Sequence, residues 1–120
     1  MKEPWLLTKK TQYSVVYRKG YAYVSTLVVM KILQNGFDYN RYGLTVSKVV
    51  GNAVKRNRVK RQLKEICRLQ EISPGWDIVL IARRVANNAR YNQLRDTVVR
   101  LMAQAGLLSE DSETTGTKFN

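Results

Sequence analysis

Residues 43–65 read GLTVSKVVGNAVKRNRVKRQLKE, and this stretch decides the fold. Its first part, taken together with Tyr42, predicts a short strand over residues 42–47. The small residues Gly51 and Asn52 then precede a long basic helix that is predicted to run to about Gln70. A strand is therefore followed closely by a strongly basic helix.

The segments outside this stretch add helices and strands on both sides. Upstream, residues 8–19 have helical spacing with Thr8 as the predicted N-cap, and residues 21–33 are β-branched and aromatic, which predicts strand. Downstream, Ser73-Pro74-Gly75 predicts a turn, residues 76–82 a strand, and residues 91–108 an amphipathic helix.

The predicted order is α-β-β-β-α-β-α. We expect an α/β (α+β) two-layer sandwich, in which a mixed sheet of about four strands packs against helices. Residues 1–108 are predicted to form a single domain, and the polar residues 109–120 a disordered C-terminal tail.

The charge of the chain predicts a polyanionic partner. Its 120 residues include 21 Lys and Arg against 9 Asp and Glu, a formal net charge of +12. Such self-repulsion is unfavourable unless nucleic acid or an anionic membrane offsets it. No apolar run approaches the ~20 residues that span a bilayer, and the apolar patch near the N-terminus is too short for a signal peptide. We therefore expect a cytoplasmic protein that binds nucleic acid and no membrane.

The sequence lacks the residue type that serves most often as a general base in protein-based catalysis. The sequence has no histidine and one cysteine, Cys67. These counts exclude an intrachain disulfide, a cysteine-based metal cluster and any nucleophile paired with histidine. Cys67 falls on the apolar side of the predicted helix, where it is expected to be a small core residue. We expect no catalytic residue and no metal site in the protein.

The basic helix has two faces when it is drawn with 3.6 residues per turn. One face is apolar and is predicted to enter the core: Val59, Leu63, Ile66 and Cys67. The opposite face forms a ridge of polar and basic residues: Asn57, Lys60, Arg61, Lys64 and Arg68. Lys55 and Arg58 lie on the flank, and Arg56 is close enough to the start of the helix to reach past its end.

The ridge has two interpretations. An ordinary solvated face would place acids among the bases at i,i+4 spacing, but here Lys60, Lys64 and Arg68 repeat like charges at that spacing. This pattern favours contact with phosphates. Gly51 and Asn52 before the helix also have two interpretations, an ordinary N-cap and a place where a phosphate approaches the helix N-terminus, and the two are compatible.

The same stretch resembles the signature of the protein subunit of bacterial ribonuclease P. In that family a strand ending in Val-Ser-Lys leads to Gly-Asn-Ala-Val, then to Arg-Asn-Arg followed by Lys-Arg, and residues 46–61 match without a gap. A looser resemblance covers about residues 6–108. Four residues depart from the family: Val49 stands where a second basic residue is common, Tyr13 and Tyr17 replace a usual phenylalanine pair, and Lys31 replaces an aromatic residue of some members.

The resemblance implies both a fold and a function. The fold has a left-handed crossover through the basic helix, against the general rule. In the holoenzyme the RNA subunit, with bound Mg²⁺, removes the 5′ leader of precursor tRNA, and the protein is accessory. The protein binds the RNA subunit and the leader, with no obligate protein partner expected. The implied ligands of the RNA subunit are Lys48, Asn52, Arg56, Asn57, Arg58, Lys60, Arg61, Lys64 and Arg68. The implied ligands of the leader are Tyr13, Tyr17 and Lys31.

Tyr13 and Tyr17 have two possible roles. They are four residues apart and share one helix face, and by spacing alone they are more typical of core residues. The resemblance favours the other role, in which they stack on unpaired bases of the leader.

Two other functions are compatible with a basic helix of this kind. The first is a ribosome-associated or generic RNA-binding protein. The second is a DNA-binding protein with the helix in the major groove, although neither a helix-turn-helix nor a zinc-finger pattern is visible.

Overall fold

The computed structural model describes residues 5–108. Their order along the chain is the predicted one, α-β-β-β-α-β-α. The elements are α1 (Lys10–Lys19), β1 (Tyr21–Val24), β2 (Val28–Gln34), β3 (Arg41–Thr45), α2 (Ala53–Leu69), β4 (Trp76–Ala82) and α3 (Tyr91–Gln104), with the short 3-10 helices η1 (Lys48–Val50) and η2 (Arg84–Asn88). No helix in this part of the chain is both long and apolar enough to cross a membrane.

The four strands form one mixed sheet in the order β1-β2-β4-β3. β2 is antiparallel to both β1 and β4, whereas β3 and β4 run parallel. A parallel pair needs a long crossover connection, and α2 supplies it between β3 and β4. The predicted crossover through the basic helix is therefore present, and its left-handedness stays a prediction.

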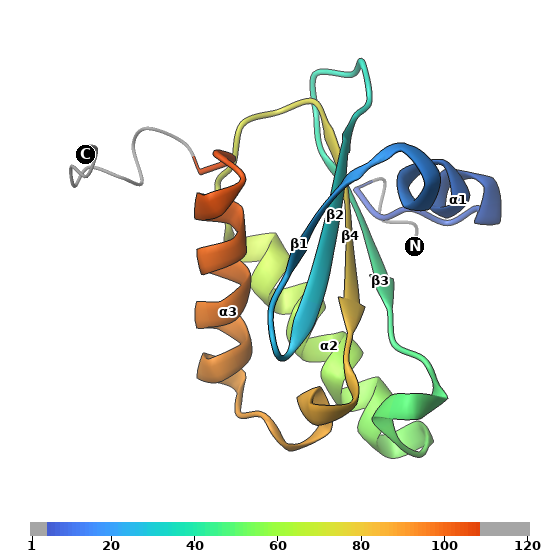
Figure 1. Cartoon of the computed structure of the whole chain (residues 1–120), viewed down its shortest axis with the longest axis vertical. Coiled ribbons are helices and arrows are strands. Elements are labelled where there is room, and N and C mark those ends of the chain that lie inside the picture. The colour runs from blue at the N-terminus through green and yellow to red at the C-terminus, as the bar shows by residue number, and fades with distance from the viewer. Residues whose placement is uncertain (1–4, 109–120) are drawn as a thin grey trace.

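Helices lie on both faces of the sheet, unequally (Figure 1). α2 and α3 cover one face, where Val28, Met30 and Ile32 of β2 are buried in the main core. The other face carries α1, whose Val16 packs with Leu7 and Val79 in a smaller cluster. The main core is the predicted two-layer sandwich, and α1 adds a partial third layer.

Residues 21–33 form a hairpin, whose turn the sequence pattern did not place. β1 and β2 are joined by Ser25–Leu27, and the hydroxyl and backbone N–H of Ser25 both donate to the Val28 carbonyl, at 2.6 and 3.0 Å. A serine side chain that forms hydrogen bonds with the backbone of a turn can stabilise it without the glycine or proline that is usual in turns.

Two predicted helix ends were wrong. The N-cap of α1 is Lys9 and not Thr8, because the Gln12 side-chain oxygen accepts from the backbone N–H groups of both residues, each at 2.9 Å. α3 ends at Gln104, short of the predicted Leu108, because Gly106 has a φ of 73° and the Leu107 N–H donates to the Met102 carbonyl. The predicted disordered tail, residues 109–120, lies outside the described residues.

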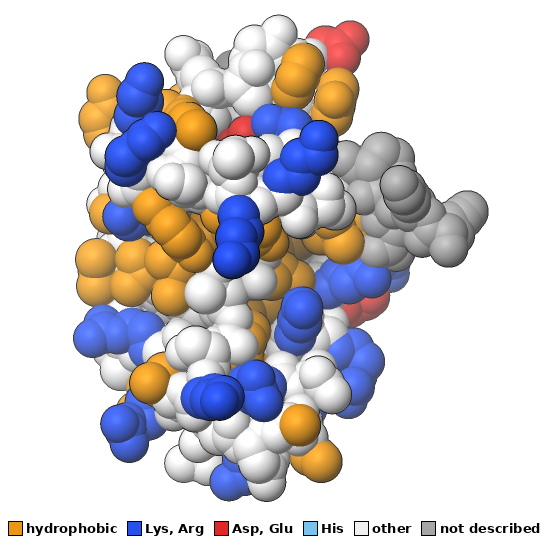
Figure 2. All heavy atoms as spheres, turned by 90° about the vertical axis from the view of Figure 1, so that its right-hand side faces the viewer, with side chains coloured by type: hydrophobic (Ala, Val, Ile, Leu, Met, Phe, Trp, Pro, Cys, Tyr) orange, Lys and Arg blue, Asp and Glu red, His pale blue; other side chains and the backbone are white. Residues whose placement is uncertain are grey.

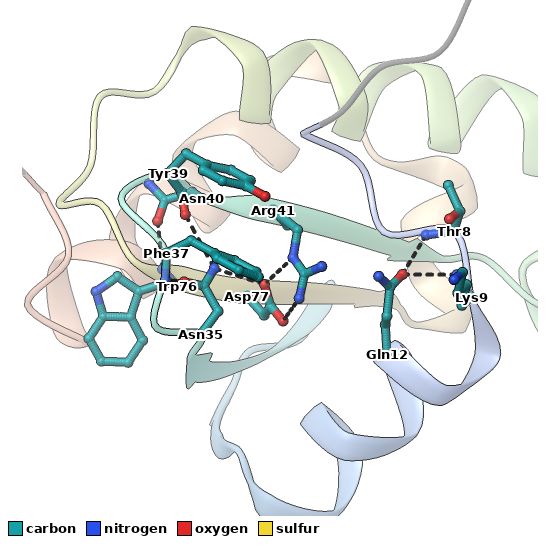
Figure 3. Close-up of polar contacts among 10 residues, drawn as sticks. All are labelled: Thr8, Lys9, Gln12, Asn35, Phe37, Tyr39, Asn40, Arg41, Trp76 and Asp77. Atoms are coloured by element: carbon teal, nitrogen blue, oxygen red, sulfur yellow. Dashed lines mark hydrogen bonds and ion pairs between the residues drawn. The ribbon is translucent and has the colours of Figure 1, made fainter.

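A buried carboxylate fixes one end of the sheet (Figure 3). Asp77 on β4 accepts two hydrogen bonds from Arg41 on β3, at 2.9 and 2.7 Å, and a third from Asn35 at 3.0 Å. These bonds tie β3 and β4 to the β2–β3 loop. The hydrogen bond to Asp77 also raises the pKa of Arg41.

Candidate nucleic-acid interface

The start of α2 is shaped by two residues of the quoted stretch. Asn52 is the N-cap, and its side-chain oxygen accepts from the Lys55 backbone N–H at 3.0 Å. Gly51 has a φ of 143°, a conformation that favours glycine, and a Cβ there would lie 2.9 Å from the Lys55 side chain. The ordinary N-cap role of Asn52 is thus confirmed. The remaining N–H groups of the first turn have no intrahelical acceptor, as at any helix start.

The two faces of α2 are the ones predicted. The buried residues are Val59, Leu63, Ile66 and Cys67, which pack against the sheet and α3 in the main core. The opposite face borders a hollow of about 410 Å³ between α2 and the edge of the sheet. Leu6 and Leu44 contribute its apolar wall, and four ridge residues contribute the polar one: Asn57, Lys60, Arg61 and Lys64.

Three other predicted ligands do not line this hollow. Lys48 is exposed on η1, the turn that joins β3 to α2. Arg56 is half-buried near the start of α2, and its Nε is buried with no hydrogen-bond partner among the described residues. Arg68, near the end of α2, forms a bidentate ion pair with Glu65, with its shortest contact at 2.9 Å. Glu65 therefore offsets part of the positive charge at the Arg68 end of the ridge.

Arg58 lies apart from the ridge. Its Nη2 donates to the backbone carbonyl of Asn87 on η2, and its Nε is buried without a partner among the described residues. The sequence placed Arg58 on the flank of the helix, nearer the apolar stripe, and the structure agrees. Its guanidinium is therefore partly engaged within the protein.

A second hollow, of about 670 Å³, lies between α1 and β3. Tyr13 and Tyr17 line it, so the structure places this predicted pair on the same groove. The sequence pattern did not indicate the other lining residues: Lys10, Thr11, Ser14, Leu44 and Thr45. Thr45 follows the apolar Leu44 in the predicted strand, and this alternation indicates that the two side chains lie on opposite faces of the sheet. No local pattern indicated that this strand lies beside α1.

The two tyrosines occupy different depths of the groove. Tyr13 is partly buried, and its hydroxyl accepts from the Leu44 N–H at 3.3 Å. Its ring lies over Gly43, where a Cβ would approach the ring to 2.6 Å. Burial raises the pKa of the Tyr13 hydroxyl, the Leu44 bond lowers it, and the nearby Tyr17 raises it. Tyr13 thus combines packing with a position on the groove wall.

Tyr17 is more accessible and is held from two sides. It is 37% exposed, and its hydroxyl forms a hydrogen bond of 2.7 Å with the Thr45 hydroxyl. Lys31 donates from Nζ to the Tyr17 backbone carbonyl at 3.1 Å and lies 5.7 Å from the centroid of the Tyr17 ring. All three residues predicted to contact the leader therefore meet on one side of α1.

The groove continues onto the open part of the sheet. The strand register places Val24, Val29, Ile81 and Thr45 side by side across all four strands, on the face that carries α1. Val24 is 63% exposed. Figure 2 shows hydrophobic side chains gathered in a band on this side of the molecule, with many Lys and Arg and few acidic side chains around them.

The described residues offer little for protein-based hydrolysis. They contain no group of three or more His, Cys, Asp or Glu side chains that could hold a metal ion. Cys67 is 1% exposed, and burial raises the pKa of its thiol, which keeps it protonated at neutral pH. The Asp77 carboxylate is engaged by Arg41. The arrangement can bind a polyanion and stack on flat rings.

Comparisons with known proteins agree with this arrangement. The family model described as Ribonuclease P matches residues 1–106. The chain is 42% identical over 118 residues to the ribonuclease P protein component of Dehalococcoides mccartyi strain CBDB1, covering 98% of each chain. It is 38% identical over 104 residues to that of Clostridium botulinum strain Loch Maree, covering 84% of this chain and 94% of the relative.

Solved structures show the same fold. The Staphylococcus aureus RNase P protein superposes with a TM-score of 0.82 at 27% identity, covering 89% of this chain and 100% of that one. The Thermotoga maritima RNase P protein gives a TM-score of 0.75 at 27% identity, covering 82% and 94%. Since the family model and the relatives both span most of its length, the chain belongs to the ribonuclease P protein family.

Proposed function

We propose that the protein binds the catalytic RNA subunit of ribonuclease P along α2 and the 5′ leader of precursor tRNA in the groove between α1 and the sheet. The observation that carries this proposal is the pair of hollows on the two sides of β3. One has a cationic wall from Lys60, Arg61 and Lys64, and the other has the aromatic walls of Tyr13 and Tyr17. Leu44 lines both, so a single edge strand separates them.

The α2 hollow suits the backbone of a structured RNA. Its cations lie on one helix face at spacings of three and four residues, which allows several of them to reach phosphates along one strand of RNA. The Asn57 amide beside them can both donate and accept, and it adds contacts to sugars or base edges. In this proposal Lys48, Asn52, Arg56 and Arg68 extend the interface along α2.

The α1 groove suits an unpaired strand. The exposed ring of Tyr17 and the outer part of Tyr13 provide platforms for bases, and stacking on aromatic side chains is tolerant of sequence. Lys31 and Lys10 place positive charge beside these rings, where a backbone phosphate would pass. The apolar side chains of Val24, Val29 and Ile81, which lie side by side across the sheet, give the bases a surface to pack against.

The protein supplies binding in this proposal, and the RNA supplies the chemistry. The described residues contain no group of three or more His, Cys, Asp or Glu side chains that could hold a metal ion. In this proposal the RNA subunit holds the Mg²⁺ ions of the holoenzyme. No step of phosphodiester hydrolysis is assigned to a side chain of this protein.

Reconstitution tests the proposal. The purified protein alone should not cleave precursor tRNA, whereas the protein with an in vitro transcribed bacterial ribonuclease P RNA in Mg²⁺ should release the 5′ leader. Cleavage by nuclease-treated protein without RNA would overturn the division of labour. Sequencing of RNA that copurifies with the protein from cells adds a second readout, because ribosomal RNA in place of ribonuclease P RNA and precursor tRNA would support the ribosome-associated alternative.

A further inference from the structure

Asn87 lies outside every motif of the sequence, yet it contacts the RNA-binding segment at two points. Its side-chain Nδ2 donates to the Val50 carbonyl at 2.8 Å, and its backbone carbonyl accepts from Arg58 Nη2. Val50 ends η1, just before Gly51 and the N-cap of α2, and Arg58 lies in the second turn of that helix. One residue of η2 thus holds both sides of the α2 start.

The held segment has few other constraints. η1 is a single turn, closed by the Val50 N–H to the Ser47 carbonyl and the Gly51 N–H to the Lys48 carbonyl, each at 3.1 Å. The Val50 side chain is fully buried, which anchors the turn from one side. Lys48 and Asn52 on either side are exposed, so the direction in which they face depends on what fixes the backbone between them. In Figure 1, η1 and η2 both lie at the lower end of the sheet, beside the start of α2.

The polar groups at this junction are not fully satisfied. Arg58 Nε, Asn87 Oδ1 and Gln62 Oε1 are buried without a hydrogen-bond partner among the described residues, and Gln62 lies one turn beyond Arg58 on the same helix. Buried polar atoms of this kind are unfavourable unless water meets them, and apolar packing would serve stability better. The junction is therefore polar inside, and its geometry depends on the two hydrogen bonds that Asn87 makes.

We infer that Asn87 is a positioning residue for RNA binding. Arg58 has the same positioning role, through its hydrogen bond to the Asn87 carbonyl, and is not mainly a phosphate ligand. Asn87 holds the Lys48–Asn52 turn and the first two turns of α2 in the arrangement that the RNA subunit meets, without touching RNA itself. Because this inference rests on the proposed function of α2, its test must separate the two.

The test compares variants of neighbouring residues in the full chain. Asn87→Ala removes the bond to Val50, and Asn88→Ala is the matched control, since Asn88 is an exposed residue of the same short helix. Affinity for an in vitro transcribed ribonuclease P RNA should fall roughly 3- to 10-fold for Asn87→Ala, the scale of one lost hydrogen bond, and stay unchanged for Asn88→Ala. Amide hydrogen exchange at residues 48–52 should quicken in Asn87→Ala alone.

General destabilisation is excluded by a second variant. Ile32→Val trims the core at the other end of β2 and lowers the melting temperature, and it should bind RNA like the unmodified protein well below that temperature. Asn87→Ala binding as tightly as Asn88→Ala would overturn the inference. The inference would also be overturned if Ile32→Val, destabilised as much as Asn87→Ala, lost as much affinity for RNA as Asn87→Ala does.

Salt dependence separates positioning from phosphate contact. Arg58→Ala removes the bond to the Asn87 backbone carbonyl, a bond that Asn87→Ala leaves in place. It should weaken RNA binding with an unchanged slope against salt. A slope reduced by about one would make Arg58 a phosphate ligand and refute its part of the inference. If Lys60→Ala and Arg61→Ala also leave RNA affinity unchanged, the proposed function of α2 fails, whatever Asn87 does.

Discussion

Tyr17 is the residue that best separates stacking from packing. Its ring is 37% exposed, so Tyr17→Ala should cost less stability than the ~3–5 kcal/mol typical of a fully buried aromatic. It should weaken binding of leader-bearing precursor tRNA by the reconstituted holoenzyme by ~1–3 kcal/mol, the value of one stacked base. Mature tRNA, which has no leader, should bind unchanged. Equilibrium binding of both substrates, beside a thermal melt, measures the difference.

Tyr17→Phe is the control for this variant. It keeps the ring and removes the hydroxyl bonded to Thr45, so stacking should persist. A Tyr17→Ala protein that melts normally and binds both substrates as before would refute the stacking role. A large fall in melting temperature would instead identify Tyr17 as a core residue.

Gly43 sets the depth of the groove. An added Cβ would lie 2.6 Å from the Tyr13 ring, which is much closer than van der Waals contact allows, so Gly43→Ala must displace that ring. We expect a destabilisation of roughly 1–3 kcal/mol, the usual range for overpacking, together with weaker leader binding. Urea unfolding and precursor tRNA affinity measure the two effects. Gly36→Ala is a poor control, because Gly36 has a φ of 78°, whereas Thr26→Ala at the exposed β1–β2 turn should change neither quantity.

At the scale of elements, α2 should determine how RNA binding depends on salt. Lys60→Ala and Arg61→Ala each remove one cation from the hollow beside β3, and each should reduce the log–log slope of RNA-subunit affinity against salt by about one. Arg100→Ala on α3 removes the same charge from an exposed site away from this hollow and should leave the slope unchanged. If Lys60→Ala and Arg61→Ala gave the same slope as the unmodified protein, as Arg100→Ala should, α2 would not be part of the interface.

α2 is also the element that the sequence predicts best. Its apolar residues recur with helical period from Val59 to Cys67, and its cap residue is an asparagine, so both its faces and its start follow from local pattern. The hairpin turn at Ser25 and the end of α3 at Gly106 were missed for a local reason too. A serine and a single glycine are weak signals, and only the hydrogen bonds they make in the fold reveal their roles.

The contacts between elements could not be predicted from local pattern. Thr45 meets Tyr17 across 28 residues of chain, and Asn87 meets Val50 across 37. Such pairs depend on the sheet order, which places β3 at an edge beside α1 and brings η2 against η1. The family resemblance indicated which residues belong to the groove, and the packing shows which of them share hydrogen bonds.

At the scale of the whole molecule, charge and burial act on different properties. The net charge of +12 favours the proposed binding of RNA. Burial changes the pKa of side chains that are uncharged when protonated: it raises the pKa of Tyr42, of Cys67 and of Tyr13. The pH dependence of stability should therefore follow these buried groups, separately from RNA binding.

A raised pKa in the folded state makes the fold hold protons that the unfolded chain releases. Cys and Tyr ordinarily titrate near 9.0 and 10.0, so their contribution to stability is complete below about pH 8.5 and is lost as pH rises above those values. With no histidine in the chain, no side chain of ordinary pKa near neutrality adds a transition there. Urea unfolding should give a steady free energy between about pH 6.5 and 8.5, then a fall of roughly 1 kcal/mol per pH unit for each ionising group. Cys67→Ala removes the group that ionises first, so its decline should begin about one pH unit higher. Equal unfolding free energies at pH 7 and pH 10 in the unmodified protein would show that these groups ionise as freely in the fold as outside it.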